Sequence, residues 1–268
     1  LDRDTHPEIW AELAHELAMS WAKRDDGNPV ENLQRAILLY RDALDLLDPE
    51  HYPCTCALFA TSLGSAFSRL AEFRGADGHL RALKCNQYAL SLLPLGREPR
   101  LRASILCNLG NAYAAMPLGD RRLNLEEAAR HYREALDLVV SSNLSDLVMP
   151  VRQNLVAARC DLAELAAGCV EPELVEDLRQ LLAQVDPRTE PIRWGECALQ
   201  LARTLPNTIG SDNGHALQEA VDLQATAIAL LEARQSDFSH ALHLVEQGET
   251  LVRLSQYTDG THLRLGMR

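Results

Sequence analysis

The sequence predicts an all-α repeat protein made of helix pairs. The first observation is an alanine that recurs at steps of 46 residues or twice that, as Ala36, Ala82, Ala128 and Ala220. The second is a leucine followed by a small residue in one phase, at 17–18, 63–64, 109–110 and 201–202. The third is a proline in one phase, at Pro7, Pro53, Pro99 and Pro191. A constant period of this length is typical of a solenoid or repeat array.

The composition limits the function classes. Of the 268 residues, 47% are hydrophobic but only 5% are aromatic, so an aliphatic core is expected. The formal net charge of −12 disfavours nucleic-acid binding, because the phosphates would be repelled. Seven cysteines, an odd number scattered through expected helices, do not suggest a disulfide framework and favour a reducing, cytoplasmic location. No apolar run approaches the length of a membrane span, and no signal peptide is visible.

Helix starts and stops divide the chain into five expected pairs. Proline fits the first turn of a helix, where its missing N–H does no harm, and Thr5 is a plausible cap for the first helix. Asn124 with Glu127 approximates a capping box. The expected pairs are 7–48, 53–93, 99–140, 146–185 and 191–233, followed by a capping helix at 238–255 and a frayed tail at 257–268.

The apolar and small residues predict how the helices pack. The first helix shows one apolar stripe, and the second is expected to turn an apolar face inward. Glycines at 64 and 110, with alanines at 82 and 128 on the second helices, would let the two axes of a pair approach closely. No pair can bury both faces alone, so neighbours must stack. The first-helix stripe is Ile9, Leu13, Leu17 and Trp21, and the second-helix face is Leu33, Ile37, Tyr40, Leu44 and Leu47.

The third pair carries a motif that resembles the tetratricopeptide repeat. That family has Leu-Gly-x-x-Tyr on the first helix and Ala-x-x-x-aromatic on the second. Here the matching residues are Leu109, Gly110, Tyr113, Ala128 and Tyr132, followed by Ala135. The resemblance covers residues 7 to about 256, and it departs in the period, which is 46 residues rather than about 34.

The long repeat also resembles the tetratricopeptide arrays attached to caspase-like CHAT peptidases. The stretches that carry this likeness are 191–194 (Pro-Ile-Arg-Trp), 108–113 (Asn-Leu-Gly-Asn-Ala-Tyr) and 119–121 (Gly-Asp-Arg). No peptidase module is recognisable, so only the array part of the likeness applies.

The tetratricopeptide resemblance implies a right-handed superhelix whose first helices line a concave groove. Asparagines beside the Leu-Gly pair hold a peptide backbone in that family, because an amide offers a donor and an acceptor side by side. Asn108, Asn111 and Asn154 form the leading candidate cluster, although Asn108 could equally be a structural hydrogen-bonder and Asn111 a surface residue. The other candidate groove residues are Gln153, Ser65, Thr61, Arg69 and Arg203.

A chaperone-tail clamp is not expected. Members that bind such tails use a lysine two residues before Leu-Gly, and none of the equivalent positions here is lysine. These positions are His15, Thr61, Cys107, Gln153, Leu199 and Val245.

No catalytic residue, metal site or cofactor is predicted. The phosphate-loop, dinucleotide, zinc-protease and nucleophile-elbow motifs are absent. His240 and His243 lack the third ligand that zinc needs. Periodicity does not place His131 against Cys107, which argues against a Cys–His nucleophile pair.

These features predict a non-catalytic scaffold or sensor that binds a protein or peptide in the groove. The acidity favours a neutral or basic partner. The alternative is a small-molecule-binding regulator, or an enzyme, that uses the groove as a closed pocket. A third possibility is self-association through an end helix, which exposed apolar positions on the helix near Ile9 would signal.

Overall fold

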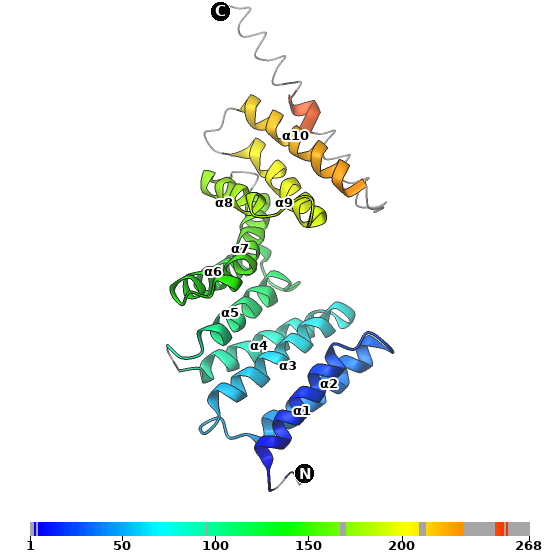
Figure 1. The fold of residues 1–268 in the computed structure, drawn as a ribbon, viewed down its shortest axis with the longest axis vertical. Helices are drawn as coiled ribbons and strands as arrows, with labels where there is room; N and C mark the ends of the chain where they lie inside the picture. The colour runs from blue at the N-terminus through cyan, green and yellow to red at the C-terminus, as the bar shows by residue number, and fades with distance from the viewer. Residues whose placement is uncertain are drawn as a thin grey trace, which may run out of the picture. The chain divides into compact units, whose positions relative to one another are not determined.

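The computed structural model describes residues 3, 5–94, 96–166, 170–208, 213–232, 250–254 and 256. Across these residues the chain is helical, contains no β-strand beyond one isolated bridge between Val170 and Thr208, and packs successive helices against each other (Figure 1). The all-α prediction is therefore confirmed. Residues 238–249 of the expected capping helix and the expected tail at 257–268 lie outside the described residues, whereas 250–254 are helical.

The chain divides into two compact parts, residues 1–158 and 159–268. We call them the N-terminal part and the C-terminal part. The N-terminal part holds α1 (Pro7–Ala22), α2 (Pro29–Leu46), α3 (Pro53–Arg74), α4 (Ala76–Leu92), α5 (Pro99–Ala114), α6 (Arg121–Ser141) and α7 (Ser145–Leu165) as far as Ala158. The C-terminal part holds the end of α7, α8 (Pro172–Ala183), α9 (Pro191–Thr204), a short 3-10 turn (Leu205–Asn207) and α10 (Asn213–Glu232).

The helix starts reproduce the period read from the sequence. The first helices of the pairs, α1, α3, α5, α7 and α9, begin at successive intervals of 46 residues. Four of these five helices begin at a proline, whose fixed φ suits the first turn. The exception is α7, which begins at Ser145. Equivalent positions also meet across neighbouring helices, since Arg100 on α5 pairs with Asp146 on α7, 46 residues later, at 2.8 Å.

Two predicted caps are wrong. α1 is preceded by His6, and no side chain caps it, because Thr5 bonds to the His6 ring instead. α6 begins earlier than expected, at Arg121, and Asp120 caps it by accepting from the backbone N–H groups of residues 122 and 123. Asn124 therefore lies inside the helix and donates back to the carbonyl of Leu118 at 2.8 Å.

Three of the four residues in the stripe expected on the first helix point to solvent, whereas Trp21 packs against the core cluster of α2 and α3. Ile9, Leu13 and Leu17 are 46%, 55% and 51% exposed. The buried side of α1 consists of three alanines and His15. Small side chains allow α1 to lie close to α2 and α3, so the large leucines are left on the outer side. The second helix behaves as expected, because Leu33, Ile37, Tyr40 and Leu47 are buried and Leu44 packs against them.

The glycines allow close packing within the helix pairs, as predicted. A Cβ atom at Gly64 would lie 2.6 Å from the Asn86 amide of α4. A Cβ atom at Gly110 would overlap the ring of Tyr132, which comes from α6. Tyr132 is only 3% exposed, so the ring has little room to withdraw. The core cluster of α5, α6 and α7 is aliphatic, with Leu106, Val139 and Val151 among its buried residues.

The C-terminal part is built in the same manner. α9 and α10 pack against each other around Ala198, Leu199 and Ala227, with Leu182 of α8 and Trp194 at the edge of this cluster. The isolated bridge joins Val170, two residues before α8, to Thr208, directly after the 3-10 turn, and Val170 N–H donates to the Asn207 carbonyl at 3.0 Å. None of the helices in the described ranges is long and apolar enough to cross a membrane.

Candidate functional site

Polar side chains of α1, α3 and α5 meet along one face of the N-terminal part. His15 Nε2 of α1 lies 3.0 Å from Ser62 Oγ of α3. Asn108 Nδ2 of α5 donates to Ser65 Oγ of α3 at 3.4 Å. Hydrogen bonds thus join the first helices of successive pairs. We call this set, together with Asn111, the polar row: His15, Ser62, Ser65, Asn108 and Asn111.

α3 holds the middle of the polar row through bonds within the helix. Thr61 Oγ1 donates to the Ala57 carbonyl at 2.7 Å, and Ser65 Oγ donates to the Thr61 carbonyl at 3.1 Å. Such bonds from a hydroxyl to the carbonyl one turn earlier fix its rotamer. Thr61 is buried, so it supports the row and presents no group to a ligand. Ser65 is half-buried, so part of its side chain remains exposed to solvent.

Asn108 and Asn111 leave complementary groups unused. They are three residues apart, so they lie on the same face of α5. The hydroxyl of Tyr132 donates to Asn111 Oδ1 at 2.6 Å, which turns the Asn111 amide nitrogen away from the helix pair. Asn108 uses its nitrogen towards Ser65. Among the described residues nothing bonds to the Asn108 oxygen or the Asn111 nitrogen, so the face offers one acceptor and one donor.

Within the part of the chain that the structure describes, the other predicted groove residues form no hydrogen bond with the polar row. Gln153 and Asn154 lie half-exposed on α7 in the N-terminal part, and no hydrogen bond joins them to Asn108 or Asn111. Arg69 is exposed on α3 and donates to the Ala22 carbonyl at the end of α1. Arg203 belongs to the C-terminal part, where it lies 3.9 Å from Glu164 and lines a cavity of about 130 Å³.

His15 is the buried member of the row. Its ring stacks on Phe59, with centroids 4.4 Å apart, and lies tilted against Tyr40 at 5.3 Å. Burial lowers the pKa of His15, and the nearby Glu16 carboxylate opposes that shift only in part. The neutral imidazole is therefore favoured, which suits its hydrogen bond to Ser62. The sequence pointed to His15 only as a position where a clamp lysine is missing.

Tyr132 is the other functional residue that the sequence did not single out as such. In the sequence it marks the aromatic position of the repeat motif, and in the structure its hydroxyl orients Asn111. Burial raises the pKa of Tyr132 far above its usual range, so the phenol remains a donor at every physiological pH. A tyrosine in the aromatic phase of the second helix, opposite a glycine and an asparagine, is the signal that could have identified it.

Nothing in the described residues resembles an activated nucleophile. Burial raises the pKa of Cys107 to about 11, so its thiol stays protonated. His131 stacks on Tyr113, with centroids 5.6 Å apart, and burial lowers its pKa. The six described cysteines are free, and no cluster of three or more His, Cys, Asp or Glu side chains occurs among the described residues. His240 and His243 lie outside them.

Comparison with known proteins adds no assignment. No protein-family model matches the chain. No curated protein matches it either.

Proposed function

We propose that the chain is a tetratricopeptide-like array that binds a protein or peptide and carries out no reaction itself. In this proposal five helix pairs and a C-terminal capping helix form a right-handed superhelix, and the polar row lies on its concave side. The 46-residue spacing of α1, α3, α5, α7 and α9 supports the repeat, as do the Gly110–Tyr132 and Gly64–Asn86 contacts.

The single observation that carries the peptide-binding proposal is the unused donor–acceptor pair of Asn108 and Asn111. A peptide group needs one acceptor for its N–H and one donor for its carbonyl, and an extended strand repeats this need along its length. The row continues over the first helices of three successive pairs, α1, α3 and α5, which suits an extended ligand better than a compact one. Glu16 is exposed beside the row, which agrees with a neutral or basic partner.

The test is capture of polypeptides from native lysate by the full chain and by variants. The Asn111→Asp variant keeps an oxygen for Tyr132 but loses the amide donors, and Asn108→Ala removes the acceptor. The matched control is Gln87→Ala, an exposed amide on α4. We expect a polypeptide that is retained by the wild type and the control and lost with Asn108→Ala/Asn111→Asp, with unchanged helical circular dichroism.

Two results would overturn the proposal. Equal retention by the wild type and the double variant would place binding outside the polar row. Retention of no polypeptide, with a metabolite found in the wild-type protein by mass spectrometry, would favour the alternative of a small-molecule regulator or enzyme.

A second candidate function is self-association through α1. The exposed Ile9, Leu13 and Leu17 favour it, because an outer helix in a repeat array normally presents a polar face to water. We propose that this stripe contacts another copy of the chain. The oligomeric state of a Leu13→Gln/Leu17→Gln variant tests this.

A further inference from the structure

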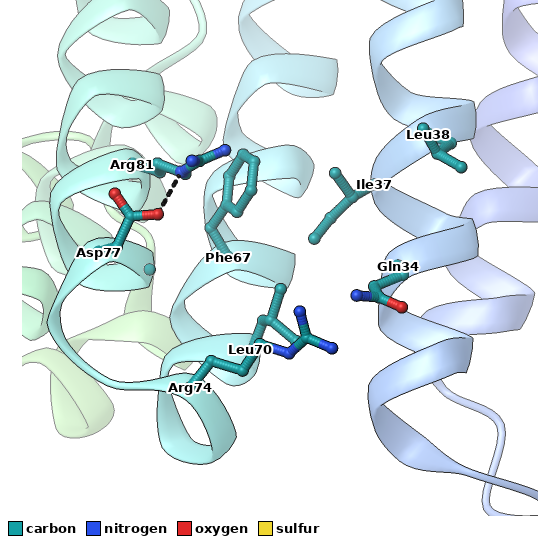
Figure 2. Close-up of a pocket in the computed structure, with 9 residues that line it drawn as sticks. Gln34, Ile37, Leu38, Phe67, Leu70, Arg74, Asp77 and Arg81 are labelled. Carbon is teal, nitrogen blue, oxygen red and sulfur yellow. Dashed lines mark hydrogen bonds and ion pairs between the residues drawn. The ribbon is translucent and has the colours of Figure 1, made fainter.

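A cavity of about 530 Å³ opens between α2, α3 and the start of α4, apart from the polar row. Its floor is apolar and is formed by Ile37, Leu38, Phe67 and Leu70. Figure 2 shows Ile37 and Phe67 directed towards each other from α2 and α3. Gln34, Arg74, Asp77 and Arg81 form a polar rim. Volumes of roughly 300–1,000 Å³ with an apolar lining and few polar groups are usual for small-molecule sites.

The backbone shapes the cavity through one turn. Gly75 has φ +84°, which lets the chain reverse at once from α3 into α4. Gly78 then lies against the last turns of α3, where an added Cβ would be 2.7 Å from the Ala71 side chain and 2.8 Å from the Phe67 carbonyl. This close approach places the rim residues of α4 beside the Phe67 ring.

The rim carries two arginines and one aspartate, so one positive charge, that of Arg74, has no carboxylate partner in the rim. Arg81 donates to Asp77 at 2.8 Å and lies over the Phe67 ring, 5.6 Å from its centroid. These two opposite charges offset each other. Arg74 faces the neutral side-chain amide of Gln34. With this amide oriented so that its oxygen points to Arg74, the oxygen accepts from both terminal nitrogens of Arg74, at 3.2 and 3.1 Å. No carboxylate among the described residues pairs with Arg74.

This arrangement points to an amphipathic monoanion. A guanidinium binds a carboxylate with two parallel hydrogen bonds, and these are stronger than bonds to a neutral amide. A carboxylate would therefore displace the Gln34 oxygen from Arg74, while the apolar body of the ligand covers Leu38, which is 60% exposed, beside the buried Phe67 ring. Burying that surface removes apolar area from water.

We propose that this cavity is a binding site for a small carboxylic acid with a branched or aromatic body, held by Arg74 and seated on Phe67, Ile37 and Leu38. The site is distinct from the polar row, because Ser65 and Phe67 are about 200° apart around α3. Peptide capture at Asn108 and Asn111 and acid binding at Arg74 can therefore succeed or fail separately.

The experiment is isothermal titration calorimetry of the full chain, once with 4-phenylbutyrate and once with its uncharged analogue 4-phenylbutyramide. We expect saturable binding of the acid with one site per chain, and binding of the amide weaker by about tenfold, the value of one modest charge-assisted hydrogen bond. Arg74→Gln should weaken acid binding about tenfold as well. Leu38→Gln should weaken the acid and the amide alike, because it removes floor area only.

The control is Arg41→Gln, which removes an exposed arginine of α2 outside the cavity lining. It should change acid binding less than about twofold. Arg74, Leu38 and Arg41 are all exposed, so the variants should keep wild-type thermal unfolding. The proposal is overturned by no saturable binding of the acid up to about 10 mM, by equal affinity for acid and amide, or by equal losses with Arg74→Gln and Arg41→Gln.

A peptide probe distinguishes two sources of the carboxylate, a small free acid and the C-terminus of a peptide. The probe is acetyl-Gly-Gly-Phe with a free C-terminus, compared with its C-terminal amide. Binding of this tripeptide no tighter than 4-phenylbutyrate supports a small free acid. Binding that is tighter by tenfold or more and that is lost with Arg74→Gln would overturn that choice of ligand and identify the occupant as a peptide C-terminus.

Discussion

Replacing Gly110 by alanine should separate close packing from helix propensity. In a solvent-exposed helix the change would stabilise by about 0.5–1 kcal/mol, because glycine is the poorer helix former. Here the new methyl group would overlap the Tyr132 ring, with the Cδ1 and Cζ atoms each 2.7 Å away. Overpacking of a filled core costs about 1–3 kcal/mol. A displaced Tyr132 also loses its bond to Asn111, worth about 0.5–1.5 kcal/mol.

The net expectation for Gly110→Ala is a loss of about 1–3 kcal/mol in the free energy of unfolding. The assay is urea denaturation followed by circular dichroism, with Ser104→Ala as the matched control on the exposed side of α5. Ser104→Ala should be neutral or slightly stabilising. If Gly110→Ala is as stable as Ser104→Ala, the close contact between α5 and α6 is wrong and the repeat geometry built on it fails.

Three further predictions concern capping, pH and association. Asp120→Ala should cost about 1 kcal/mol in urea denaturation, since it leaves two N–H groups of α6 uncapped. His15 and His131 have pKa values lowered by burial, so the unfolded chain takes up protons before the folded chain as the pH falls. The free energy of unfolding should therefore be nearly constant above about pH 7.5 and should decline as the pH falls through 6.5. His15→Phe/His131→Phe should reduce this slope between about pH 7.5 and 5.5. If α1 mediates an oligomer, Leu13→Gln/Leu17→Gln should dissociate it and so lower the sedimentation coefficient of the protein, without lowering the free energy of unfolding. An unchanged oligomer would exclude α1 as the interface.

The helices could be predicted from sequence because their signals are local. Proline at a helix start and glycine at a turn act within one or two residues, so the starts of α1, α3, α5 and α9 were placed correctly. Caps were less predictable because several residues compete for one role. Asp120 and Asn124 both suit an N-cap, and the choice depends on where the preceding loop leaves the chain.

The faces of the helices were harder to predict than their positions. Apolar periodicity assumes that the largest hydrophobic side chains turn inward, and α2 obeys this rule. α1 does not, because alanines give the closest approach to α2 and α3 while Leu13 and Leu17 project outward. A pattern of hydrophobicity alone cannot separate a large apolar outer face from a small apolar inner one.

The polar row was predictable in part. Asn108, Asn111 and Ser65 follow from their phase beside the Leu-Gly pair, but their partners do not. The bonds from His15 to Ser62 and from Asn108 to Ser65 join residues 47 and 43 positions apart, on different helices. The cavity at Arg74 was not predictable, because its lining comes from three helices and depends on the turn at Gly75.

Close packing and ligand presentation meet at one contact. Gly110 admits the Tyr132 ring, the ring brings its hydroxyl to Asn111, and that bond turns the Asn111 amide nitrogen outward. A glycine required for packing thus also sets the direction of the group proposed to bind a peptide. It follows that Gly110→Ala should reduce peptide capture in parallel with Asn111→Asp even at temperatures where the variant is fully folded, whereas a purely structural glycine would leave capture by the folded fraction unchanged.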